Sequence, residues 1–151
     1  MNTIFKLTTF TKITSLTLLI YSGAALAKPT IAMYKSPTCG CCTEWADIME
    51  EKGYQVQVKA ERDWRDVKQA FAMPANLQSC HTAIIEGYLI EGHVPEADIA
   101  RLLEERPANI KGLAAPGMPQ HSPGMAGPGQ AYKNFDVIAF SPTGLTIYSR
   151  Y

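Results

Sequence analysis

Three of the four cysteines of the chain fall within four consecutive positions, at Cys39, Cys41 and Cys42. A short β-rich run at residues 30–35 precedes them and a helical pattern at residues 43–52 follows, so we expect the cysteines where a strand leads into a helix. The unpaired N–H groups and the positive dipole end of a helix stabilise a thiolate at such a position. Thiolates attack disulfides and also bind soft metal ions, so the cluster predicts one of these two chemistries.

Disulfide chemistry explains the cluster incompletely. Only Cys39 with Cys42, a C-x-x-C spacing, closes a disulfide without strain, and Cys41 is then left with the distant Cys80. A structural disulfide framework spreads its cysteines along the chain, whereas this chain concentrates them. Exchange through Cys39 and Cys42 also leaves a third thiol beside the redox pair. Three thiolates on one turn instead suit Cu(I), and less specifically zinc, and bridging thiolates can hold more than one ion.

Two further positions offer ligands. Cys80 and His81 start the third expected strand, where redox proteins of the expected fold usually keep a cis-proline, and both side chains are metal ligands. The alternative is a buried cysteine beside a hydrogen-bonded core histidine. His93 stands just before the last expected helix, at the same end of the sheet, and an ordinary surface or capping histidine is the alternative there.

A proline- and glycine-rich stretch at residues 107–130 carries Met118, His121 and Met125. Thioethers bind Cu(I) without deprotonation, so this loop could supply ligands. The same methionines could instead pack the loop onto the core as a lid. A loop of this length is usually functional or disordered, and few of its residues look like core candidates.

The order of the expected elements predicts the fold. Strand, helix, strand, helix, strand, strand and helix follow one another, with a tight turn at Glu86-Gly87 and Pro95 opening the last helix. This is an α/β, thioredoxin-like order (βαβ, then ββα), with the cysteine cluster at the first strand–helix junction and a C-terminal β-hairpin. The expected segments are helices at 43–52, 63–73 and from 95 onward, and strands at 30–35, 54–59 (half-buried), 82–85, 88–91, 135–140 and 145–148.

The first 27 residues resemble a secretory signal peptide. Lys6 and Lys12 precede an apolar run at residues 13–21, and Ala25-Leu26-Ala27 is a small-residue cleavage pattern, so we expect cleavage after Ala27. A membrane-spanning helix needs about 20 residues, and the apolar run is shorter than that. An uncleaved membrane anchor is the alternative. We therefore expect an exported, periplasmic protein with a single domain at residues 28–151 and no membrane association after cleavage. Its slightly acidic charge and lack of a basic stripe exclude nucleic-acid binding.

Taken together, several motifs resemble the CopG family of exported bacterial copper-resistance proteins. The resemblance covers most of the expected mature chain. It implies a thioredoxin-like fold, copper bound at the clustered cysteines in a thiolate-bridged multinuclear site, and a role in copper handling that includes switching between Cu(I) and Cu(II). The motifs are residues 34–42 with Trp45, Ser79-Cys80-His81-Thr82-Ala83, Gly92-His93-Val94-Pro95, Gly112-Leu113-Ala114, Pro116-Gly117-Met118-Pro119 and Ser122-Pro123-Gly124-Met125.

The resemblance also implies a ligand set. Our leading hypothesis is a periplasmic copper-binding protein of copper resistance and homeostasis, with periplasmic copper chaperones or efflux components as partners. The alternative is a periplasmic thiol-disulfide oxidoreductase that uses Cys39 and Cys42, and a structural zinc module is a third. The resemblance leaves open whether the protein is a copper oxidoreductase or a copper buffer. His121 departs from the family pattern, in which this position usually holds a small residue. The implied ligands are Cys39, Cys41, Cys42, Cys80, His93, Met118 and Met125.

Overall fold

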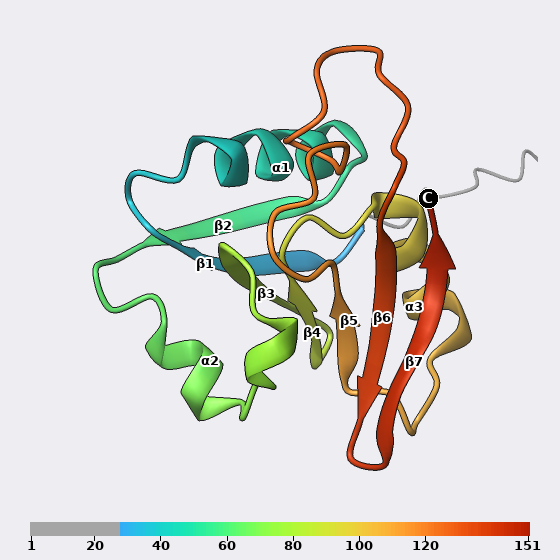
Figure 1. Ribbon diagram of the computed structural model, residues 1–151. Coiled ribbons are helices and arrows are strands. Elements are labelled where there is room, and N and C mark those ends of the chain that lie inside the picture. The colour runs from blue at the N-terminus through green and yellow to red at the C-terminus, as the bar shows by residue number, and fades with distance from the viewer. Residues whose placement is uncertain (1–27) are drawn as a thin grey trace, which may run out of the picture.

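The computed structural model describes residues 28–151, so the expected signal peptide lies outside the described residues. These residues form a twisted seven-stranded sheet in the order β2-β1-β3-β4-β5-β6-β7; in Figure 1 β2 lies above β1 at the left, and β3 to β7 follow toward the right. Three α-helices and one short 3-10 helix connect the strands. In chain order the elements are β1 (Thr30–Lys35), α1 (Gly40–Glu51), β2 (Gln55–Ala60), α2 (Asp66–Ala70), η1 (Ala75–Leu77), β3 (His81–Ile85), β4 (Tyr88–Glu91), α3 (Glu96–Glu105), β5 (Gly112–Ala114), β6 (Asp136–Ser141) and β7 (Gly144–Arg150).

The first four strands have the predicted thioredoxin-like arrangement. β1 and β2 are parallel and joined through α1, β3 pairs antiparallel with β1, and β4 returns antiparallel to β3. The turn between β3 and β4 has positive φ at both central residues, 46° at Glu86 and 86° at Gly87, as the tight hairpin turn requires. The register of β1 with β3 pairs Lys35 with His81. The start of β3 therefore lies beside the end of β1, from which the cysteine segment continues.

The two faces of the sheet carry separate hydrophobic clusters because alternate residues of a strand point to opposite faces. Helices α1 and α3 cover one face, and Trp45, Met49, Ile99 and Leu102 are fully buried there. The segment that contains α2 and η1 covers the other face with Met73 and Leu77. On the α1 face the strands contribute Ile31, Met33, Ala83, Ile85, Ile90, Leu113, Val137 and Ala139, and on the opposite face Leu89, Ala114 and Phe140.

The interpretation of residues 107–130 as poor in core residues was wrong for their first part. Gly112–Ala114 form β5, which pairs with β4 on one side and β6 on the other, and Leu113 is fully buried. A Cβ on Gly112 would stand 2.0 Å from the carbonyl oxygen of Leu89 in β4, so the close approach of the β4 backbone requires glycine there. A strand of three residues is too short to show a period-two pattern. This strand attaches the C-terminal hairpin, which was correctly predicted, to the rest of the sheet.

The boundaries of two predicted helices and the burial of one predicted strand also need correction. The helix expected at 43–52 begins three residues earlier, at Gly40, and the helix expected at 63–73 is limited to Asp66–Ala70. The strand expected to be half-buried at 54–59 is β2, an edge strand of the sheet formed by residues 28–151, and within β2 only Val56 is half-buried.

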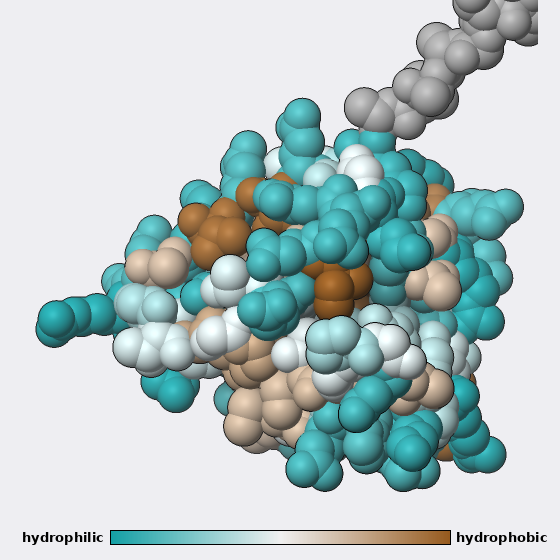
Figure 2. Space-filling model, turned by 90° about the horizontal axis from the view of Figure 1, so that it is seen from above, coloured by the Kyte–Doolittle hydropathy of each residue, from teal (hydrophilic) through white to brown (hydrophobic). Residues whose placement is uncertain are grey.

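Within residues 28–151, none of the helices combines the length and the apolar character needed to cross a bilayer. The face seen from above in Figure 2 is mostly hydrophilic, and its hydrophobic patches are small and separate.

Candidate metal centre

The turn between β1 and α1 sets the position of the cysteine cluster. The amide of Cys39 donates a 3.1 Å hydrogen bond to the carbonyl of Ser36, and Cys39 is the N-cap of α1. The earlier start of the helix places Cys41 and Cys42 in its first turn. Cys42 is fully buried against the core, whereas Cys39 and Cys41 are half-buried. The first helical turn therefore directs one cysteine inward and leaves two near the surface.

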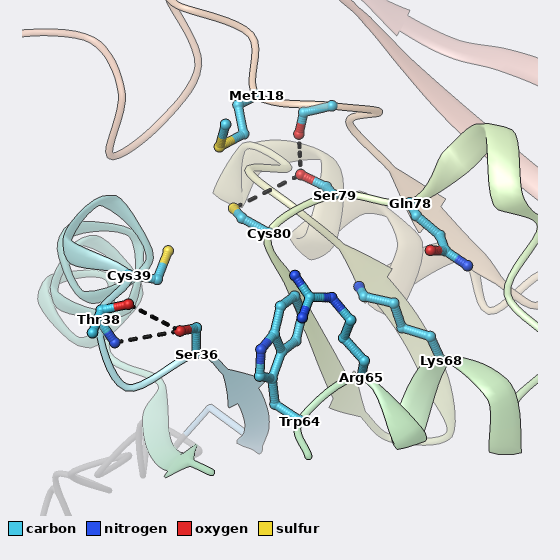
Figure 3. A pocket seen from close by; sticks show the side chains of 11 residues that line it. Ser36, Thr38, Cys39, Trp64, Arg65, Lys68, Gln78, Ser79, Cys80 and Met118 are labelled. Carbon is cyan, nitrogen blue, oxygen red and sulfur yellow. Dashed lines mark hydrogen bonds between the residues drawn. The ribbon is translucent and has the colours of Figure 1, made fainter. Parts of the chain in front are cut away.

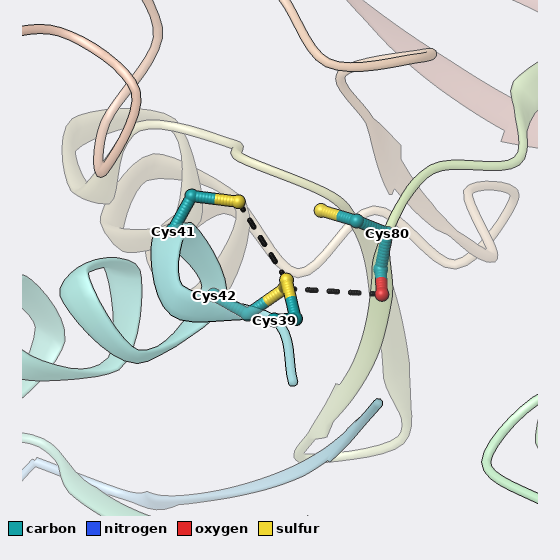
Figure 4. A group of neighbouring side chains, drawn as sticks. All are labelled: Cys39, Cys41, Cys42 and Cys80. Carbon is teal, nitrogen blue, oxygen red and sulfur yellow. Dashed lines mark hydrogen bonds between the residues drawn. A yellow bond between two sulfur atoms is a disulfide. The ribbon is translucent and has the colours of Figure 1, made fainter. Parts of the chain in front are cut away.

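Cys39 and Cys42 form a disulfide with a Cα–Cα distance of 5.4 Å, the pair that the spacing allows. Cys41 and Cys80 are free thiols, and Figure 4 shows their side chains pointing toward each other from α1 and from the start of β3. The Cys41 thiol lies 3.6 Å from the Cys39 sulfur. All four sulfur atoms lie within 4.8 Å of one another. Sulfur atoms distant in sequence thus converge at one point, as the thioredoxin-like order predicted.

His93 lies beside Cys80 in a defined tautomer. Its Nδ1 is 2.6 Å from the carbonyl oxygen of Pro123, which can only accept, so Nδ1 carries the proton and donates. Its Nε2 is therefore the acceptor for the Cys80 thiol, 2.9 Å away. Burial raises the pKa of the Cys80 thiol to about 11, and burial lowers the pKa of His93. Both groups are neutral near pH 7, with the Nε2 lone pair aimed at the sulfur.

His81 adds a second imidazole on the same side. Because it begins β3 on the α1 face, its ring is fully buried, 4.7 Å from the ring of Trp45 and 5.1 Å from that of His93. Burial, and then the proximity of His93, lowers the pKa of His81 well below its ordinary value. Its Nε2 is buried and has no hydrogen-bond partner within the described chain. Cys42, Cys80, His81 and His93 form a second group of ligand atoms within 4.8 Å, which shares two sulfurs with the first.

The Pro/Gly/Met loop, which joins β5 to β6 and carries Met118 and Met125, is attached to this site at two places besides the Pro123 carbonyl. At the first, the Ser79 hydroxyl donates to the Gly117 carbonyl, which places Met118 above Cys80 (Figure 3). At the second, a Cβ on Gly124 would lie 2.6 Å from the Cys41 carbonyl, so the loop packs directly on the start of α1. Met118 is 60 % exposed and borders the pocket next to Cys39 and Cys80.

Met125 has a different position from Met118. It is half-buried, and its amide donates to the carbonyl of Ser122 within the loop. Unlike Met118, it does not border the pocket beside Cys39 and Cys80 in the described chain. The structure thus brings six of the candidate ligand side chains to one end of the sheet, the four cysteines, His93 and Met118, and leaves Met125 in the adjoining loop.

A buried ion pair on the opposite face of the sheet supports the site, and it was not predicted from the sequence. Lys68 of α2 and Glu91 at the end of β4 form an ion pair in which both side chains are almost fully buried. The other Glu91 partners are the Thr82 hydroxyl, at 2.6 Å, and the Ser79 amide, at 2.6 Å. Glu91 therefore anchors the backbone directly before Cys80.

The donor set fits a soft metal ion. Thiolate sulfur and neutral imidazole nitrogen are ligands that Cu(I) and zinc accept, and a ligating histidine normally donates its other ring N–H to a carbonyl, as His93 does to Pro123. The Nε2 of His81 has no hydrogen-bond partner among the described residues, so this nitrogen is available as a further metal ligand. Cys39 and Cys42 can contribute only after their disulfide is reduced, because the thiolate is the ligand. The same geometry also permits dithiol–disulfide cycling at Cys39 and Cys42.

Comparisons with known proteins agree with this arrangement. The solved structures "Copper resistance protein copG- Form 1" and "Copper resistance protein copG- Form 2" each match with a TM-score of 0.74 and 36% sequence identity. Each match covers 82% of this chain and 98% of the solved chain. Residues 77–125 match the family described as "Protein of unknown function, DUF411". No curated protein sequence matches the chain.

Proposed function

This chain belongs to the CopG family of copper resistance proteins, and from that premise we propose that it binds copper in copper resistance, as Cu(I) held by cysteine thiolates. The observation that carries the proposal is the convergence of the Cys80 sulfur with those of Cys39, Cys41 and Cys42, all within 4.8 Å. Soft thiolates select Cu(I), and the apolar surroundings of Cys42 limit the access of water. In this proposal the copper ion is the cargo of the protein.

The two overlapping groups contain five of the seven ligands that we assign. We assign the four cysteines and His93 as the principal ligands, with Met118 and Met125 as additional soft donors of the loop. The two groups share Cys42 and Cys80, and a thiolate can bridge two ions, which supports binding of more than one copper ion. Imidazole stabilises Cu(II) and thiolate stabilises Cu(I), so this mixed set is also compatible with a change of copper oxidation state.

The cellular setting is part of the same proposal. The expected cleavage after Ala27 would release the protein into the periplasm, where it would receive copper from chaperones or pass it to efflux components. The disulfide between Cys39 and Cys42 is compatible with an oxidising compartment.

Anaerobic Cu(I) titration against a competing chelator tests the proposal. Fully reduced protein is expected to bind Cu(I) more than about a hundredfold more tightly than protein with the Cys39–Cys42 disulfide, because oxidation removes two thiolate ligands. Loss of a residue that only hydrogen-bonds to a ligand already lowers metal affinity by about 10–100-fold. The oxidised protein is the matched control, because its sequence is the same. Weak or sub-stoichiometric uptake by reduced protein, unchanged by Cys41→Ser, would refute the proposal.

The disulfide itself favours a second candidate, a thiol-disulfide oxidoreductase that uses Cys39 and Cys42. This function predicts reduction of insulin disulfides at a rate that survives the loss of Cys41, Cys80 and His93. The copper function predicts that these three residues matter for metal uptake. Measuring both activities on the same variants separates the two candidates.

Gly124→Ala tests the role of the loop. Gly124 has φ of +78°, and a Cβ there would meet the Cys41 carbonyl at 2.6 Å, so the loop must move away from α1. Because the adjacent Pro123 carbonyl orients His93, we expect Cu(I) affinity to fall by about 10–100-fold. The measurement is the chelator competition described above.

Gly129→Ala is the matched control for this substitution. Gly129 has nearly the same φ, +73°, but nothing within 4 Å of its ideal Cβ position. It should show only the backbone strain of about 1–2 kcal/mol, with Cu(I) affinity unchanged. Equal Cu(I) affinities for the two variants would show that the contact of the loop with α1 does not support the site.

A further inference from the structure

A pocket of about 450 Å³ adjoins the sulfur cluster, between the start of α1, helix α2 and the Ser79–Cys80 segment (Figure 3). This volume is in the range of small-molecule sites. Cys39 borders the pocket, whereas its disulfide partner Cys42 does not and is fully buried. A molecule in the pocket can therefore reach the disulfide at the Cys39 sulfur.

The charged side chains that border the pocket are both cationic, Arg65 and Lys68. The charge of Lys68 is compensated by Glu91, behind the pocket wall. Arg65 forms no ion pair within residues 28–151, and its guanidinium lies 4.7 Å from the centre of the Trp64 ring. Figure 3 shows Arg65 extending along Trp64 toward the pocket interior. An exposed guanidinium without a carboxylate partner favours an anionic ligand such as a carboxylate.

We propose that this pocket binds a low-molecular-weight thiol that carries carboxylate groups, and that this thiol reduces the Cys39–Cys42 disulfide. The inference rests on the proposed copper function, because reduction provides the two thiolates that the site needs. We infer a thiol because the Cys39 sulfur, which a thiolate can attack, borders the pocket, and we infer a carboxylate because the Arg65 guanidinium can bind one. The hydroxyls of Ser36 and Thr38 also border the pocket and hydrogen-bond to each other at 3.1 Å, so one of their two protons is left for the ligand.

The reduction takes two steps. The thiolate of the first thiol attacks the Cys39 sulfur, forming a mixed disulfide, while the Cys39–Cys42 bond breaks and its electron pair leaves on the Cys42 sulfur. A second thiolate then attacks the small-molecule sulfur of the mixed disulfide, and Cys39 leaves as a thiolate. Two thiols are oxidised to one disulfide, the protein disulfide gains two electrons, and the two thiol protons go to the protein thiolates or to solvent.

The test compares glutathione with its diethyl ester as reductants of the oxidised, metal-free protein. The two probes have the same thiol but differ in carboxylate charge, and the rate of disulfide opening is followed by alkylation and mass measurement. At equal thiolate concentration, glutathione is expected to react about three- to tenfold faster than the ester, since an opposite charge beside the binding site speeds association. Arg65→Gln should remove this preference by slowing only the reaction with glutathione.

Arg62→Gln is the matched control, because Arg62 is exposed, carries the same charge and does not border the pocket. The first mixed disulfide should map to Cys39. The proposal is overturned if the two probes react equally, if Arg65→Gln and Arg62→Gln behave alike, if the mixed disulfide forms on Cys42, or if oxidised protein contains no Cys39–Cys42 disulfide.

A separate measurement distinguishes this inference from the copper function. Protein reduced with dithiothreitol, which is then removed, is titrated with Cu(I) alone, and Arg65→Gln should bind as the wild type does. Failure of reduced wild-type protein to bind Cu(I) would refute the proposed function and leave the charge-selective reduction standing. Normal Cu(I) binding without charge selectivity would refute the pocket assignment alone.

Discussion

Cys80→Ser is expected to weaken Cu(I) binding by more than about a hundredfold, a loss as large as that expected for Cys39→Ser. Loss of a residue that only hydrogen-bonds to a metal ligand already lowers affinity by about 10–100-fold, and Cys80 is itself an assigned ligand. The Cys80 sulfur is the one sulfur of the cluster that comes from outside residues 39–42, and both groups of candidate ligands contain it. A serine oxygen is a hard donor that Cu(I) binds poorly. The measurement is an anaerobic chelator competition on reduced protein.

The fold should tolerate this substitution, so the loss reports on the site. Serine is close in size to cysteine, and its hydroxyl can donate to His93 Nε2 as the Cys80 thiol does. Exchange of the Cys39–Cys42 disulfide with small thiols should continue in Cys80→Ser, because Cys80 takes no part in that bond. A Cys80→Ser protein that binds Cu(I) as tightly as the wild type would favour the oxidoreductase candidate.

The convergence of the sulfurs could be predicted because it depends on strand order. A cysteine cluster directly after β1 and a cysteine directly before β3 must meet if β1 and β3 are antiparallel neighbours, and the register pairs Lys35 with His81. The order of the elements was enough to predict that pairing. The position of His81 follows from the same pattern, since period-two alternation places it on the same face as Ala83 and Ile85.

Other parts of the site had no local signal in the sequence. β5 consists of three small or apolar residues in a glycine- and proline-rich stretch, and its pairing with β4 and β6 is determined by contacts distant in sequence. A disulfide and a metal site would use the same cysteines, so the cysteine spacing alone could not decide between disulfide chemistry and metal binding. The orientation of His93 depends on a carbonyl at Pro123, which any residue at that position would provide.

The Lys68–Glu91 pair was also unpredictable, because a charged residue in a short helix or at a strand end usually faces solvent. Its partners lie 23 positions apart, and only the packing of α2 on the sheet brings them together. Lys68→Met is expected to reduce the free energy of unfolding by about 3–5 kcal/mol, since it leaves a buried carboxylate without its counter-charge. Urea unfolding of the metal-free protein measures this loss.

The pH dependence of the loss identifies its cause. Burial raises the pKa of Glu91 above its ordinary value of 4.5, while Lys68 lowers it, so removing Lys68 raises this pKa further. A group whose pKa is raised by folding stabilises the folded protein below its unfolded pKa and loses that contribution as pH rises. The stability difference between Lys68→Met and wild type should therefore be smallest below pH 4.5 and grow above it.

The pair also connects the opposite face of the sheet with the sulfur site, and a functional effect should accompany the loss of stability. Glu91 holds the Ser79 amide, and the Ser79 hydroxyl holds the Gly117 carbonyl beside Met118. If an uncompensated Glu91 shifts this segment, Cys80 moves with it. Cu(I) affinity should then fall by about 10–100-fold, as for loss of other residues that position metal ligands.

Lys52→Met, at an exposed position, is the matched control and should change neither the free energy of unfolding nor the Cu(I) affinity. A Lys68→Met protein as stable as this control would show that Glu91 is satisfied by Ser79 and Thr82 alone.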